Sequence, residues 1–337
     1  MRAARSLLHQ LTLLACLCAP APAQAVCAGA NLFDALTVQV QGDLRARAVE
    51  APFGEGLFWQ AVRGEQRITL IGTFHFDDPR HAATLAALAP ALGEAQVLLV
   101  EAGPAEEAAL QAAMVERLDL FFLPTGPTLP ERLSEHDWQR LIEAMRARGV
   151  PAFFAAKFKP WYAAMTLSLS PCALGEVAAG QKGLDGQLIA AANARALPVR
   201  ALEPFDAALT LFDLVSDTDQ IDLVRAALLT AASADDYTAT LADAYFAEET
   251  RLIWEFTRHD ALTNSGLDAE VVEAQLRLGE DYLLVRRNRA WLAPILAEAS
   301  HGPVLVAVGA LHLPGQGGLL AMLQGEGFRL TRLALPR

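Results

Sequence analysis

The sequence predicts an α/β fold with a central, mostly parallel sheet flanked by helices and interrupted by a large helical insertion. Residues 68–71 (Ile-Thr-Leu-Ile) and 304–308 (Val-Leu-Val-Ala-Val) are short, mainly apolar runs, and each is followed by Gly-x-x-His. Apolar runs that end at glycine are typical of strands buried on both faces of a parallel sheet. From about 104 to 300, apolar residues recur at helical spacing instead. We therefore expect a single domain, residues 26–337, carrying a helical insertion at about 104–300.

Residues 1–25 have the pattern of a secretory signal peptide. Basic residues precede an apolar core at 7–17, and residues 23–25 (Ala-Gln-Ala) suit a cleavage site. That core is shorter than the roughly 20 residues that span a bilayer, so we expect no transmembrane helix in the mature chain. The sequence thus predicts an exported protein, periplasmic or secreted. An alternative is a lipid anchor at Cys16, because residues 13–16 loosely resemble a lipoprotein box.

Two cysteines, Cys27 and Cys172, remain after removal of the signal peptide. Exported proteins meet an oxidising compartment, so we expect these two to form a disulfide. Two buried thiols are the alternative. The mature chain has no Cys-x-x-Cys, and a thiolate zinc site is therefore not expected.

Composition excludes some classes of function. The chain has 337 residues, of which 53% are hydrophobic and 20% charged, and this is enough for a sizeable core. Its formal net charge is −12 and its one basic cluster is short, at 286–289, so nucleic acid is not an expected partner. No glycine-rich nucleotide-binding motif and no Gly-x-Ser-x-Gly occurs, which argues against a nucleotide enzyme and a serine hydrolase.

The elements of the α/β part follow from local signals. A turn at 63–66 joins two alternating segments into a hairpin. Pro79 suits the first residue of a helix. The apolar run at 97–100 then completes a strand-helix-strand unit, for which we expect a right-handed crossover. Glycines and prolines delimit the remaining elements. We expect helices at 34–51, 79–92 and 319–325, and strands at 56–62, 67–72, 97–100, 199–202, 303–308 and 328–334.

Four of these strands end in residues that carry chemistry: His75, Glu101, Glu203 and His312. Open sheets of this class bind ligands beyond the carboxyl ends of their strands. Two imidazoles with one or two carboxylates there are a suitable set of ligands for Zn, Mn, Fe or Co. A single histidine after a strand is more often a loop cap, but the duplicated Gly-x-x-His with Glu101 between favours a shared site.

Residues of the insertion have two interpretations each. Lys159 precedes Pro160 and Trp161, which suits a helix start but also a cation that binds substrate. Asp185 suits a helix N-cap, or an acid facing the cleft. Arg287 and Arg289 suit a solvated helix face, while either one turned inward would hold a substrate carboxylate or steady an anionic intermediate.

Together these motifs resemble the TraB/PrgY/GumN family, and its exported GumN-like branch most closely. The resemblance rests on residues 70–75, 78–80, 99–101, 159–161, 183–185, 202–203 and 308–320 in this order. That family is similar to the Tiki proteins, regarded as metal-dependent proteases, and more distantly to erythromycin-esterase-like and heme-binding ChaN-like proteins. The resemblance implies an α/β core with a helical insertion and a metal site at His75, Glu101 and His312.

The expected function is therefore that of an exported metal-dependent hydrolase, a peptidase that acts on peptides or proteins. A divalent ion (Mn, Co or Zn) would activate a water molecule, and Glu101 or Glu203 would accept its proton beside Arg287. Two alternatives stay open. A metal-independent esterase would use one histidine as the base, oriented by Glu101, and a non-catalytic protein would bind a peptide, heme or metal in the same pocket.

Overall fold

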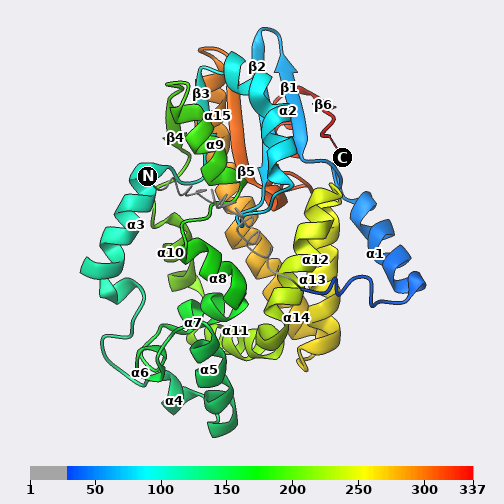
Figure 1. Ribbon diagram of the computed structural model, residues 1–337. Helices are drawn as coiled ribbons and strands as arrows, with labels where there is room; N and C mark the ends of the chain where they lie inside the picture. Colours follow the sequence, from blue (N-terminus) through cyan, green and yellow to red (C-terminus); the bar gives the residue numbers. More distant parts are fainter. Residues whose placement is uncertain (1–28, 337) are drawn as a thin grey trace, which may run out of the picture.

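A computed structural model describes residues 29–336 (Figure 1). Its sheet has six strands in the order β4-β3-β5-β2-β1-β6. The strands β4, β3, β5 and β2 are parallel to one another, and β1 pairs antiparallel with both β2 and β6. This confirms the expected α/β class with a mostly parallel sheet. The strands are β1 (Phe58–Arg63), β2 (Gln66–Thr73), β3 (Val97–Val100), β4 (Val199–Ala201), β5 (Val304–Gly309) and β6 (Arg329–Arg332).

The predicted hairpin is β1 and β2. Arg63 lies opposite Gln66 across the turn, and Gly64 within it has a φ of +58°, a conformation that glycine adopts without a steric penalty. Strand β2 then runs parallel to β5, so the two ends of the predicted domain meet in the middle of the sheet. The two Gly-x-x-His motifs therefore follow neighbouring strands.

Helices cover both faces of the sheet, which explains why β3 and β5 are apolar throughout. In β5, Val304, Val306 and Val308 pack with residues of α15 (Arg286–Ala299) and α16 (Leu319–Gly325). The alternate residues, Leu305 and Ala307, pack on the other face with residues of α2 (His81–Glu94) and α9 (Leu184–Asn193). Side chains of successive residues point to opposite faces of a strand, so each face needs its own apolar set.

The range expected for the insertion, about 104–300, contains α9, β4 and α15, which belong to the α/β core. The other helices in it form two groups, one between β3 and α9 and one between β4 and α15; Figure 1 places both beyond one end of the sheet. The first group is α3 (Pro104–Glu116), η1 (Leu118–Leu120), α4 (Leu129–Arg132), α5 (Glu135–Ala147), α6 (Ala152–Ala155), α7 (Pro160–Ser168) and α8 (Pro171–Ala178). The second is α10 (Ala207–Leu211), η2 (Phe212–Leu214), α11 (Asp217–Thr230), η3 (Ala231–Ser233), α12 (Ala234–Phe246), α13 (Thr250–Asn264), α14 (Ala269–Glu280) and the π-helical η4 (Asp281–Val285).

Helix α1 (Val38–Glu50) lies at the outside of the molecule against α13. Thr37 caps it, because its side chain accepts a hydrogen bond from the Val40 amide. Leu44 and Ala48 form its buried face, and they pack with Leu252 and Phe256 of α13. The short η5 (Ala310–His312) follows β5 directly.

Several expectations concern residues outside the described range. These are the signal peptide at 1–25, the anchor at Cys16, and Cys27. Cys172, at the start of α8, is disulfide-bonded, and its pairing with Cys27 stays a prediction. Within the described range, every helix is too short or too polar to cross a membrane.

Candidate active site

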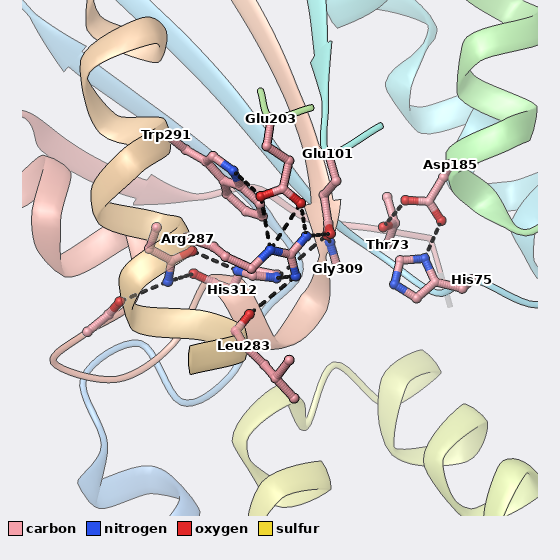
Figure 2. A network of polar contacts seen from close by, with 12 residues as sticks. Thr73, His75, Glu101, Asp185, Glu203, Leu283, Arg287, Trp291, Gly309 and His312 are labelled. Atoms are coloured by element: carbon pink, nitrogen blue, oxygen red, sulfur yellow. Dashed lines mark hydrogen bonds and ion pairs between the residues drawn. The ribbon is translucent and has the colours of Figure 1, made fainter. Parts of the chain in front are cut away.

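The sheet brings four predicted site residues to one edge. Strands β4, β3, β5 and β2 are neighbours and parallel, so their carboxyl ends lie side by side. Glu203, Glu101, His312 and His75 follow these strands, in that spatial order. Figure 2 shows the side chains around this edge, with Arg287 reaching in from α15. The site is thus a product of topology, since its members are far apart in sequence.

Arg287 joins the two carboxylates. Its Nη2 donates to Glu101 Oε2 at 2.6 Å and also to Glu203 Oε1, and its Nε lies 3.1 Å from both oxygens of Glu203. Trp291, one turn along α15, donates its indole N–H to Glu203 Oε2 at 3.0 Å. All three charged side chains are mostly buried, with 12 to 16% of each exposed. Buried charges are tolerated only when paired and hydrogen-bonded, and here two carboxylates share one guanidinium.

His312 has its tautomer fixed by Asn288. The Asn288 amide nitrogen donates to the carbonyls of His312 and Gly317, so its oxygen Oδ1 must be the acceptor for His312 Nδ1, at 2.7 Å. Nδ1 therefore carries the proton, and Nε2 presents a lone pair. That nitrogen lies 3.4 Å from Arg287 Nη1 and 3.7 Å from Glu101 Oε1. The buried imidazole is thus oriented toward the carboxylate.

His75 is oriented in the same way by Asp185. Asp185 Oδ2 lies 2.9 Å from His75 Nδ1, and its other oxygen accepts a hydrogen bond from the Thr73 hydroxyl. The approach depends on Gly183, because a Cβ there would lie 2.2 Å from the His75 carbonyl carbon. The Leu184 amide also donates to the Phe74 carbonyl at 3.0 Å. The start of α9 is therefore packed directly on the loop that carries His75.

The side chains of the site converge above Gly309. A Cβ added to this glycine would lie 3.2 Å from Glu101 Oε1, 3.3 Å from His75 Nε2 and 3.6 Å from His312 Cδ2. The Gly309 amide also donates to Glu101 Oε1 at 2.6 Å. Gly309, the glycine of the second Gly-x-x-His, thus lets the two histidines and the carboxylate approach one another where a larger side chain would crowd them.

Comparison with known proteins identifies the family of the chain. The model of the TraB/PrgY/gumN family matches residues 57–332, which span all six strands and both histidine motifs. The chain belongs to the TraB/PrgY/gumN family. It is 28% identical over 278 residues to a protein of Escherichia coli (strain K12) described as uncharacterized protein YbaP, covering 80% of this chain and 94% of that protein. No solved structure was found to match.

In this TraB/PrgY/gumN member, the donor chemistry suits a divalent ion. Both histidines have Nδ1 tied to a second residue and Nε2 left toward the site, the arrangement usual for histidines that bind metals. As they lie, however, no three His, Cys, Asp or Glu side chains within residues 29–336 are grouped to hold an ion. Arg287 is close to Glu101 and His312. His75, Glu101 and His312 would have to draw together to bind a metal, and the metal stays a prediction.

Burial and charge set the protonation of this site. Burial, with the positive charges of Arg287 and His75, lowers the pKa of His312 to about 4, against the opposing effect of Glu101. Burial alone would raise the pKa of Glu101, but His312, His75, Arg287 and the Gly309 amide lower it to about 2. Asp185 raises the pKa of His75, although that ring is 62% exposed and water screens part of the attraction. At neutral pH, Glu101 is thus ionised and His312 is neutral.

This predicts a loss of stability in acid that His312 causes. In the unfolded chain His312 takes up a proton below about pH 6.5, whereas in the folded protein it is protonated only below about pH 4. The folded state therefore loses about 3 kcal/mol as the pH falls through this window. Urea unfolding at pH 7, 5 and 4 with a chelator present measures it. His312→Gln is expected to reduce the change in the free energy of unfolding between pH 7 and pH 4. His301→Gln, at an exposed position, should leave that change as in the wild type. An equal change in both variants would contradict the prediction.

Two residues predicted to bind substrate lie outside this network. Lys159 is half-buried at the N-cap of α7, where its amide donates to the Phe121 carbonyl. Arg289 is exposed on α15, two residues beyond Arg287 and therefore turned to another side of the helix. Asp185 lies in the first turn of α9 instead of at its N-cap, which is Gly183. Substrate binding by these three side chains stays a prediction.

Three residues of the site were not predicted from the sequence: Asn288, Trp291 and Thr73. Trp291 follows Arg287 by four residues, so the two share a helix face, and this spacing was a usable signal. Asn288 lies inside the basic run at 286–289, and nothing in that run predicts that its side chain is fully buried. Thr73 lies within the first Gly-x-x-His, at a position where the motif allows any residue.

Proposed function

We propose that this chain is an exported metal-dependent hydrolase, a peptidase whose divalent ion is held by His75, Glu101 and His312. One observation carries the proposal: two histidines from neighbouring strands each have Nδ1 engaged by a second residue, so both leave Nε2 for the same site. Histidines that only stabilise a fold have no need of this common orientation. The signal-like residues 1–25 support export, and the family resemblance supports peptides or proteins as substrates.

The residues around the ion would have separate tasks. A bound divalent ion lowers the pKa of a water molecule and polarises a carbonyl. Glu101 suits a ligand better than a base, because a carboxyl group with a pKa of about 2 accepts protons poorly. Both oxygens of Glu203 accept hydrogen bonds from Arg287, so Glu203 positions that guanidinium and is not free to move protons. Arg287 in turn holds Glu101 Oε2, leaving Oε1 toward the point above Gly309.

A metal-independent hydrolase is the second candidate, and a specific contact favours it. Arg287 Nη1 lies 3.4 Å from His312 Nε2, so a cation already stands beside one proposed ligand. Asp185 raises the pKa of His75 to about 9, so the base in this candidate is the neutral form of His75, which grows in share as the pH rises toward that pKa. Its Nε2 then takes a proton from water, while Asp185 holds its Nδ1–H and stabilises the imidazolium that forms. Arg287 then offsets the negative charge that develops on the substrate.

Metal analysis and peptide cleavage decide between the two. We expect the purified mature protein to contain a divalent ion, or to take up Mn, Co or Zn, and to cleave a peptide mixture only when loaded. His75→Ala and His312→Ala should each lose the metal and lower cleavage at least about 100-fold, because removing a ligand takes away the activated water. Cleavage products are followed by chromatography, before and after chelation.

His301→Ala is the matched control, since His301 is exposed outside the site. It should keep both metal and activity. Hydrolysis that survives chelation and needs no added ion would support the metal-independent candidate, with loss only in His75→Ala. A folded wild type that binds peptide, heme or metal and releases no product from peptides or esters would overturn both hydrolase candidates.

A further inference from the structure

The guanidinium of Arg287 contacts the nitrogen that His312 would offer to an ion. Asn288 fixes a proton on His312 Nδ1, so Nε2 has one lone pair and acts only as an acceptor. Arg287 Nη1 lies 3.4 Å from this nitrogen and donates to it, because arginine keeps its protons in proteins. The same lone pair cannot accept this hydrogen bond and bind an ion. An ion therefore binds His312 Nε2 only after Arg287 Nη1 has moved away.

The contacts of Arg287 differ in length, which shows the part of the guanidinium that is held least firmly. Its two longest hydrogen bonds are those of Nη1, at 3.4 Å to His312 Nε2 and 3.2 Å to the Leu283 carbonyl. Nε lies 3.1 Å from both oxygens of Glu203, and Nη2 donates to Glu203 and, at 2.6 Å, to Glu101. Hydrogen bonds between two charged groups are about twice as strong as neutral ones. The guanidinium is thus held firmly on its carboxylate side and weakly on the side of His312 (Figure 2).

Glu203 is placed to keep the guanidinium paired when it moves. It follows β4 at the edge of the sheet, whereas the three proposed ligands follow β3, β5 and β2. A shift toward Glu203 thus takes the guanidinium away from all three. Because a buried charge that loses its partner is costly, this pair lets Arg287 leave His312 without becoming unpaired. Trp291 supports Glu203 here, since its indole N–H donates to Glu203 Oε2 at 3.0 Å.

We propose that Arg287 is a gate for the metal site, which covers His312 Nε2 until an ion displaces the guanidinium toward Glu203. This gate rests on the proposed function, because it regulates the same site. It accounts for the finding that, within residues 29–336, the proposed ligands are near one another but not grouped to hold an ion. Only the fraction of molecules with Arg287 shifted binds metal, so the gate lowers the apparent affinity below that of the ligands alone.

The affinity for zinc tests this gate without an assay of turnover. Zn²⁺ is titrated into the chelator-treated mature protein in competition with a fluorescent zinc chelator. Arg287→Gln removes the guanidinium and should lower the Kd for Zn²⁺ at least about tenfold. Arg287→Lys keeps the positive charge but has one nitrogen in place of three, so it cannot contact both carboxylates and His312 together. We expect its Kd to fall at least about threefold.

The neighbouring arginine provides matched controls. Arg286 is 47% exposed and pairs with Asp281 at the surface, so Arg286→Gln and Arg286→Lys should bind Zn²⁺ as the wild type does. Adding His312→Ala to Arg287→Lys should remove the gain in affinity, because the gate acts on that imidazole. Circular dichroism at pH 7 confirms that each variant is folded. If Arg287→Gln does not fold, Arg287→Lys decides alone, since its ammonium still pairs with the buried carboxylates.

The outcomes separate the gate from the metal site itself. Equal Kd values in the wild type and both Arg287 variants, with binding lost in His312→Ala, would overturn the gate and leave the metal site standing. Tighter binding by Arg287→Gln but not by a folded Arg287→Lys would also overturn the gate, because charge alone then sets the affinity. Uptake by the Arg287 variants and not by the wild type would support the gate. No binding by any of these proteins would overturn the metal site and the gate together.

Glu203→Gln tests the direction in which the guanidinium moves. It weakens the pairing that the shifted guanidinium would keep, so it should raise the Kd for Zn²⁺ at least about threefold in the wild type. In the Arg287→Gln background the same change should have a smaller effect, because no guanidinium is left to hold. An equal effect in both backgrounds would show that Glu203 acts through its charge alone, and would refute the shift toward it.

Discussion

Arg287→Met is expected to lower the free energy of unfolding by about 3 to 5 kcal/mol, the usual result of leaving a buried charge without its partner. Without the guanidinium, the carboxylates of Glu101 and Glu203 stay close together with little access to water. Their repulsion and desolvation then oppose folding. Methionine fills most of the removed volume, so the loss reports charge more than packing. Urea unfolding at pH 7 with a chelator present measures the difference.

The neighbouring residue gives the control. Arg286 is 47% exposed, and its bond to Asp281 lies at the surface, so Arg286→Met should leave stability nearly unchanged. Adding Glu203→Gln to Arg287→Met removes one of the two charges and should restore part of the loss, a non-additive result that only coupled residues give. If Arg287→Met proves as stable as Arg286→Met, the buried ion pairs do not hold the site together.

The strands could be predicted from sequence because their signals are local. A run such as 304–308 is apolar throughout since both of its faces are covered, and glycine then marks where it ends. The hairpin followed from alternation and a turn. The division of the helices into two groups did not follow, although a strand at 199–202 was expected. Helical spacing in the sequence does not show that α9 packs on the sheet while its neighbours do not.

The members of the site were predictable, but their contacts were not. Residues after parallel strands converge wherever the sheet is open, so His75, Glu101, Glu203 and His312 could be named from order alone. That Arg287 lies against both carboxylates depends on how α15 is rotated over the sheet, a property of packing between distant segments. The hydrogen bond between Asp185 and His75 likewise depends on packing between distant segments, so the sequence predicted only that Asp185 could face the site.

If the chain is the hydrolase proposed above, Gly309→Ala is expected to lower hydrolysis at least about 100-fold while leaving the protein folded. The backbone at Gly309 has a φ of −49°, which alanine adopts freely, so the change in the free energy of unfolding should stay below about 1 kcal/mol. The added methyl group would lie 3.2 Å from Glu101 Oε1 and 3.3 Å from His75 Nε2, at the point where the proposed ion and its water would lie. Displacing either group by a few tenths of an ångström and filling that point should lower kcat/KM at least about 100-fold.

Gly93→Ala separates this effect from the general effect of replacing a glycine. Gly93 is exposed in α2 with nothing within 4 Å of an added Cβ, so alanine should raise stability by about 0.5 to 1 kcal/mol and leave activity unchanged. Both variants are compared by thermal unfolding, metal uptake and turnover of the same peptide. Because Gly309→Ala keeps every side chain of the site, loss of activity in a stable protein would place the reacting water above Gly309. Full activity there would move the chemistry elsewhere on the strand edge, whatever the histidine variants show.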